Sequence, residues 1–215
     1  MYLPAHFAEN RPAALHKLMD QHPLATVVAV TAAGLQANHI PVVFQPNGGS
    51  VGILKGHIAR ANTPWRDLKN GAEVLAIFQG ASRYISPNWY PSKLETGQVV
   101  PTWNYTVVHA HGRITWVQDA SWLRDFLVAL TGRHERGYAN PWRMSDAPAK
   151  YIEGMLGAIV GFEIALERLT GKWKLSQNRS ARDRAGVVAA LSAFPDEESQ
   201  RMAKLVEFPD RGTAD

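Results

Sequence analysis

Residues 24–57, LATVVAVTAAGLQANHIPVVFQPNGGSVGILKGH, carry the pattern that decides the predicted fold. The segments 24–31 and 35–44 are rich in Val, Ile and Thr, which favour β-strands. An Asn-Gly pair at 47–48 is a strong hairpin signal, so we expect 51–57 to return as the partner of the preceding strand. Three strands therefore follow one another with no long helix between them. This order is typical of an antiparallel sheet or barrel and not of a doubly wound parallel sheet.

The rest of the chain predicts further strands and peripheral helices, so the expected fold class is α+β. The expected additional strands are residues 73–80, 105–117 and 158–169. The expected helix caps or starting residues are Asn10, Thr63, Asp119 or Ser121, Asp146, Ser180 and Pro195. Each of the longer candidate helices contains apolar residues at helical spacing, which predicts that one face of the helix packs on the sheet.

The composition is ordinary for a soluble globular protein and excludes several classes of site. Of 215 residues, 46% are hydrophobic and none is Cys, which rules out disulfides, thiolate metal sites and a Cys nucleophile. Neither a G-x-G-x-x-G nor a P-loop motif is present. A net charge of +4 is typical of a protein that binds a phosphate-bearing ligand, whereas a dedicated DNA-binding protein often has a denser basic face. We see no signal-peptide pattern and no apolar stretch near the ~18–20 residues of a bilayer span, so we expect a cytoplasmic protein with no membrane partner.

Residues 81–104, ASRYISPNWYPSKLETGQVVPTWN, are expected to form one long loop. A loop of this length inside a compact domain is usually functional or disordered, and its aromatic residues argue against disorder. Trp89, Tyr90, Trp103 and the following Tyr105 could pack a planar ring. Each of them taken alone is more often an anchor for the core or the loop.

A strand with the sequence VHAHGRITW places His109, His111 and Arg113 on one face, because side chains alternate along a strand. Two His residues at this spacing could bind a metal if His39 or His57 supplied a third ligand. The alternatives are a half-polar strand at an interface and an anion contact. We predict no metal site here.

The segment ILKGHIARAN is a stronger candidate for binding an anion. His57, Arg60 and Asn62 follow the end of a strand, just before a helix start at Thr63. Free N–H groups at a helix start and the planar fork of Arg both suit phosphate. The hairpin would bring Asn38 and His39 close by. In the alternative interpretation Arg60 pairs with Asp67 or Glu73, and His57 has a structural role.

Residues 171–186, GKWKLSQNRSARDRAG, hold five basic residues and one acidic residue. The stretch could bind nucleic acid with Trp173 stacked on a base, or it could serve a phosphate-bearing cofactor. It follows a strand, so alternation predicts Lys172 and Lys174 on one face and Trp173 with Leu175 on the other. We therefore expect Trp173 to be packed in the protein.

Four stretches together resemble the PaiB-type family of FMN-binding negative transcriptional regulators. They are MYLPAHF, HIARANTPWRDL, YISPNWYPSKLETGQVVPTWNYTVVHAHG and IVGFEIALERLTGKWKLSQNRSARDRAGV. The resemblance implies a flavin-reductase-like split β-barrel over residues 1–191, with 192–215 as a C-terminal helical tail. It also implies a homodimer that binds FMN at the subunit interface. The cofactor-binding residues that it implies are Asn38, His39, His57, Arg60, Asn62, Gln79, Trp103, Asn104, Lys172, Trp173, Lys174 and Ser176.

The sequence is compatible with two functions. One is an FMN-binding regulator or flavin-linked redox sensor, with an FMN-dependent oxidoreductase acting on a small molecule as the alternative. The other is a DNA-binding repressor whose flavin is incidental. The sequence shows no helix-turn-helix, zinc finger or basic arm, and DNA is therefore the weaker partner prediction. No catalytic residue can be assigned, although His39 and His57 could carry protons.

Overall fold

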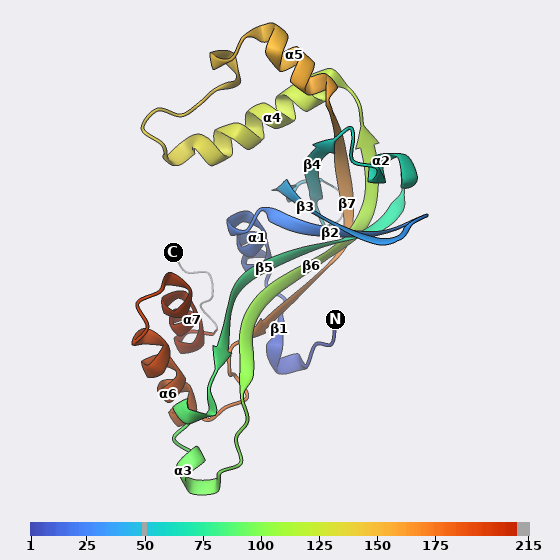
Figure 1. The fold of residues 1–215 in the computed structure, drawn as a ribbon. Coiled ribbons are helices and arrows are strands. Elements are labelled where there is room, and N and C mark those ends of the chain that lie inside the picture. Colours follow the sequence, from blue (N-terminus) through green and yellow to red (C-terminus); the bar gives the residue numbers. More distant parts are fainter. Residues whose placement is uncertain (49–50, 210–215) are drawn as a thin grey trace. The chain divides into compact units, whose positions relative to one another are not determined.

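Seven strands form one sheet in the computed structural model, which describes residues 1–48 and 51–209 (Figure 1). The strand order is β1-β7-β4-β3-β2-β5-β6, and β6 also pairs with β7, so six of the strands form a closed ring of pairings. The pairings β1–β7, β2–β3, β2–β5, β3–β4 and β4–β7 are antiparallel. The strands are β1 Ala8–Glu9, β2 Leu24–Thr31, β3 Gly34–Gln45, β4 Ile53–Ala59, β5 Ala72–Ile85, β6 Thr102–Val117 and β7 Ile159–Lys174. The expected antiparallel α+β fold is confirmed.

Helices lie between the strands and after the last strand. They are α1 Pro12–Gln21, α2 Pro64–Asp67, α3 Lys93–Thr96, α4 Ala120–His134, α5 Ala149–Gly157, α6 Ala181–Ser192 and α7 Glu197–Glu207. In the part of the chain that the structure describes, no helix is both long and apolar enough to cross a bilayer.

The chain divides into two compact units, and each is described by itself. Unit 1 consists of residues 1–22, 78–108 and those from Thr170 onward, and unit 2 consists of 23–77 and 109–169. The long strands β5, β6 and β7 contribute a segment to each unit.

Unit 2 has an apolar interior built by strand alternation. On β2, Ala25, Val27 and Ala29 are buried, and the residues between them are more exposed. On β7, Val160, Phe162, Ile164 and Leu166 are buried, as their common face predicts. The helices α4 and α5 run side by side over a separate small core of Leu123, Ile152 and Leu156 (Figure 1).

Unit 1 buries one face of each of its longer helices. Leu15, Leu18 and Met19 of α1 are buried, and so are Val187 and Leu191 of α6. From α7, Met202, Ala203 and Val206 are buried, and Figure 1 shows α7 beside α6. Ser180 caps α6 as expected, because its hydroxyl accepts a hydrogen bond from the amide of Asp183.

Several predicted boundaries are wrong. The strand expected to stop at residue 80 continues to Ile85, and the next strand begins at Thr102, so the long loop shrinks to 86–101 and itself holds α3. Arg11 rather than Asn10 caps α1, and Pro148 rather than Asp146 precedes α5. Asp146 instead accepts a hydrogen bond from the amide of Arg143. Asp119 caps α4, one of the two expected choices. Part of the predicted turn after β3 lies outside the described residues.

Candidate functional site

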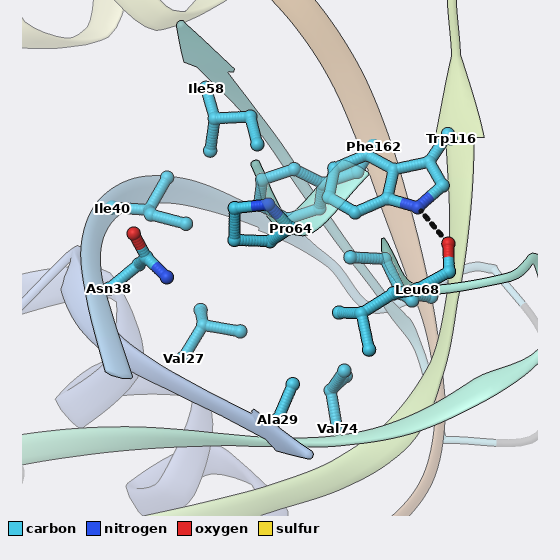
Figure 2. Close-up of a pocket in the computed structure, with 11 residues that line it drawn as sticks. Val27, Ala29, Asn38, Ile40, Ile58, Pro64, Leu68, Val74, Trp116 and Phe162 are labelled. Atoms are coloured by element: carbon cyan, nitrogen blue, oxygen red, sulfur yellow. Dashed lines mark hydrogen bonds between the residues drawn. The ribbon is translucent and has the colours of Figure 1, made fainter. Parts of the chain in front are cut away.

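One cavity in unit 2 is too small to hold a flavin. Figure 2 shows a cavity lined by apolar side chains of several strands and α2, with the amide of Asn38 among them. Its volume is about 20 Å³, which is room for about one water molecule. The indole N–H of Trp116 donates to the carbonyl of Leu68 at 2.9 Å and joins β6 to the segment after α2. This cavity is therefore not the binding site of a ligand as large as FMN.

Arg60 follows β4 and is fixed by three hydrogen bonds to neutral oxygens. Its Nε donates to the carbonyl of Gly157 at 2.9 Å, and its Nη2 donates to the carbonyl of Ile159 at 3.0 Å. Its Nη1 donates to Oε1 of Gln118 at 3.0 Å, and its guanidinium lies 5.5 Å from the ring centroid of Trp65. Among the described residues no carboxylate forms an ion pair with Arg60, so the alternative pairing with Asp67 or Glu73 is not seen.

The guanidinium of Arg60 therefore keeps an uncompensated charge in a fixed position. Arg has five N–H donors, and three of them are used here. The two remaining N–H groups and the charge are what a phosphate needs for charge-assisted hydrogen bonds.

Asn38 and Asn62 are brought together as expected. The Nδ2 of Asn62 donates to Oδ1 of Asn38 at 2.8 Å and ties the loop after β4 to β3. Both residues are half-buried, whereas His39 points the other way along β3 and is exposed. The helix after this loop is only one turn long and begins with Pro64, which has no N–H, so the expected donors at its start are fewer than a full helix would offer.

His57 lies on the face of β4 opposite Leu54 and Ile58, next to α4. Its ring contacts the ring of Phe126 edge-on, with 5.8 Å between centroids. Its Nδ1 is buried and has no hydrogen-bond partner among the described residues. Burial lowers the pKa of His57 below its ordinary value, so the imidazole is neutral near pH 7. Because this nitrogen is buried, it is not accessible to a ligand in this structure.

The strand face with His109, His111 and Arg113 is partly exposed, as alternation predicts. Burial lowers the pKa of both His residues. Arg113 donates to Glu167 at 2.8 Å and to the carbonyl of Gly71 at 3.0 Å. Within residues 1–48 and 51–209, no group of three His, Asp or Glu side chains is arranged to hold a metal ion.

The basic stretch of unit 1 is largely occupied by contacts within its own unit. Trp173 is only 4% exposed, so the prediction that it packs in the protein is confirmed. Asn104, which is fully buried, donates from Nδ2 to the hydroxyl of Ser176 at 3.0 Å. Arg182 pairs with Glu95, and the guanidinium of Arg179 lies 4.7 Å from the ring centroid of Tyr90.

Two of the expected unit 1 residues remain accessible. Gln79 is exposed on β5, and Trp103 is 54% exposed on β6. The ring of Trp103 meets that of Tyr84 edge-on, with 6.3 Å between centroids. Sequence reasoning missed Tyr2 and Thr102, which accept hydrogen bonds from Lys172 and Lys174. No spacing rule could have found Tyr2, because 170 positions separate it from Lys172.

The chain matches known proteins over nearly its whole length. A family model described as "Putative FMN-binding domain" matches residues 1–168. The Bacillus subtilis protein named "Protease synthase and sporulation protein PAI 2" is 31% identical, over 96% of this chain and 97% of its own.

Two solved structures share the fold. The FAD and heme binding protein from Mycobacterium smegmatis has a TM-score of 0.59 at 21% identity, covering 83% of this chain and 78% of its own. The flavocytochrome Anf3 from Azotobacter vinelandii has a TM-score of 0.56 at 16% identity, covering 90% and 74%. This likeness confirms the expected split-barrel fold class.

Proposed function

This chain belongs to the family of the putative FMN-binding domain, whose cofactor is FMN, and we propose that it is an FMN-dependent redox protein acting on a small molecule. FMN, when bound, accepts and donates electrons, and the protein supplies position and electrostatics. We place the phosphate of FMN at the loop after β4. This assignment covers both an oxidoreductase and a redox sensor, because each requires the same bound flavin.

The fixed, uncompensated guanidinium of Arg60 is the observation that supports this placement. A phosphate monoester carries about −1.5 to −2 charges at pH 7, so it gains most from a cation that no carboxylate already neutralises. Arg60 has two N–H groups left for it. Asn38 holds the amide of Asn62 in place beside this loop.

We also propose a two-fold homodimer. Leu24, Val30 and Leu35, on β2 and β3, are 59%, 70% and 77% exposed, so an apolar outer surface of unit 2 is uncovered in a single chain. A second copy of the same surface is the simplest cover for it. Sedimentation at micromolar concentration should show a dimer, and a monomer that still binds FMN would contradict this arrangement.

A DNA-binding repressor is the weaker alternative. The basic residues of 171–186 that could follow a duplex are mostly engaged: Lys172 is buried, Arg182 pairs with Glu95, and Arg179 lies against Tyr90. The flavin assignment needs no DNA contact. Titration of promoter DNA across a salt series tests the alternative, since a repressor would show a steep salt dependence.

The deciding experiment is a titration of flavin-stripped protein with FMN, riboflavin and FAD. We expect FMN to bind at least tenfold more tightly than riboflavin, because the phosphate adds charge-assisted hydrogen bonds worth ~1.5–3 kcal/mol. Riboflavin binding as tightly as FMN would remove the phosphate site from the proposal. A failure to bind any flavin, together with steeply salt-dependent DNA binding, would overturn it in favour of the repressor.

A further inference from the structure

Lys172 is a buried lysine with no acidic partner. It is 8% exposed, and its Nζ donates to the carbonyl of Tyr2 at 3.0 Å. The ammonium also lies 5.7 Å from the ring centroid of Tyr2 and 5.4 Å from that of Tyr105. Glu9 is close in the sheet, because Ala8 pairs with Lys172, but its carboxylate is bound by Arg11 at 2.5 Å. The positive charge of Lys172 is therefore held by a carbonyl and two aromatic faces alone.

Lys174 lies two residues further along the same strand and is also without an acidic partner. Its Nζ donates to the hydroxyl of Thr102 and to the carbonyl of Trp103. Burial, and after it the charges of Lys172 and Arg179, lower the pKa of Lys174. Arg179 in turn interacts with the carboxylate of Asp183. In residues 1–48 and 51–209, neither lysine forms an ion pair.

Two neighbouring ammonium groups without counter-charge are unfavourable in a partly buried place. Each ammonium has three donors, and Lys172 uses one and Lys174 two on neutral oxygens. An anion bound here would relieve the repulsion and use the remaining donors. The residue whose carbonyl accepts from Lys174, Trp103, has a 54% exposed ring that contacts the 45% exposed ring of Tyr84, and these rings could pack a planar group.

From this arrangement we propose that Lys172 and Lys174 form a binding site for a small organic anion, a carboxylate or phosphate attached to a planar group that contacts Trp103. This site goes beyond the proposed function and does not depend on the placement of the flavin. The backbone carbonyls of Tyr2 and Trp103 fix the two ammonium groups before the ligand arrives. A nucleic acid duplex fits less well, because the buried Lys172 is out of reach of its backbone.

The test uses the full chain loaded with FMN and the probes inorganic phosphate, acetate and benzoate, followed by calorimetry. We expect benzoate to bind more tightly than acetate, and Lys174→Gln to weaken benzoate binding about tenfold or more, the effect of one charge-assisted hydrogen bond. Lys174→Arg should restore part of the affinity. Lys93→Gln is the matched control, because Lys93 is an exposed lysine of the same unit that contacts only the amide oxygen of Asn88.

Lys172→Gln is measured as a second variant, with circular dichroism to confirm that it is folded. Unchanged benzoate binding in Lys174→Gln, or an equal loss in Lys93→Gln, would overturn the site. A loss of affinity for FMN but not for riboflavin in Lys174→Gln would assign these lysines to the flavin phosphate, and would also overturn it while leaving the proposed cofactor intact. If the protein bound no flavin but benzoate binding still depended on Lys174, the redox function would fail and the anion site would stand.

Discussion

Replacing Arg60 separates its structural contribution from its proposed contact with phosphate. Arg60→Ala removes three hydrogen bonds and a contact with Trp65. At ~0.5–1.5 kcal/mol for each partly exposed bond, we expect a loss of about 2–4 kcal/mol in the free energy of unfolding. For a chain of this size that corresponds to a melting temperature lower by roughly 4–16 °C. Differential scanning calorimetry of the flavin-free protein measures this loss without any ligand.

The flavin contact is measured on the same variants by the ratio of FMN to riboflavin affinity. Arg60→Ala should lower FMN affinity about tenfold or more and leave riboflavin affinity unchanged, because only FMN carries the phosphate. Arg60→Lys keeps the charge without the planar fork, so its FMN affinity should lie between those of the wild type and Arg60→Ala. Gln118→Ala is the control, because it removes one hydrogen-bond acceptor of Arg60. It should reduce stability and leave the ratio of FMN to riboflavin affinity unchanged. If Arg60→Ala is folded and keeps the wild-type ratio, Arg60 does not touch the phosphate and its charge has a structural role.

Three further perturbations test the packing around the proposed sites. Burial lowers the pKa of His57, so the contribution of this residue to stability should be complete above about pH 6.5 and should fall as the pH drops toward the folded-state pKa. The urea midpoint of His57→Gln should therefore change less between pH 8 and pH 5.5 than that of the wild type, and an equal change would contradict this. Asp183→Ala leaves the amide and hydroxyl of Ser92 without their acceptor and should reduce the free energy of unfolding by about 1–3 kcal/mol, where no reduction would show that water replaces the carboxylate. Gly161→Ala puts a methyl group 2.4 Å from Cζ3 of Trp122, so we expect ~1–3 kcal/mol of destabilisation and an altered near-ultraviolet dichroism; a variant identical to the wild type in both would show that α4 shifts freely.

The strand order was predictable because local signals repeat along the chain. The Val- and Thr-rich residues 24–31 and the Asn-Gly pair placed the first hairpins correctly. The predicted end of β5 at Gly80 was wrong, because the Pro- and aromatic-rich residues that follow were assigned to a long loop. Gly80 lies within the strand, where a Cβ would come within 2.3 Å of the hydroxyl of Thr106 on β6. A glycine required by a neighbour 26 positions away has no local signature.

The candidate site was predictable as a set of residue types but not as contacts. The resemblance selected Arg60, yet its partners at Gly157 and Ile159 depend on the approach of β7, about 100 positions later. Alternation predicted that Trp173 is packed and that Lys172 lies on the opposite face of the strand, but it did not predict that Lys172 is buried too. Lys172 is buried because the amino-terminal residues cover that face as well, and the strand is enclosed on both sides.

The division of unit 1 into three stretches has a consequence for synthesis on the ribosome. The apolar face of α1 belongs to a unit that is completed only after Thr170 has been made, and β1 pairs only with residues 171–172. At about 5–20 residues per second, the first 22 residues wait on the order of ten seconds for their partners. Leu18 can pack beside Gly80 once β5 has been made, but Leu15, which lies beside Gly171, remains uncovered on the nascent chain until the end of that interval, where chaperones and premature aggregation compete for it. The yield of folded protein should therefore depend on holdase capacity more than the stability of the finished fold would suggest.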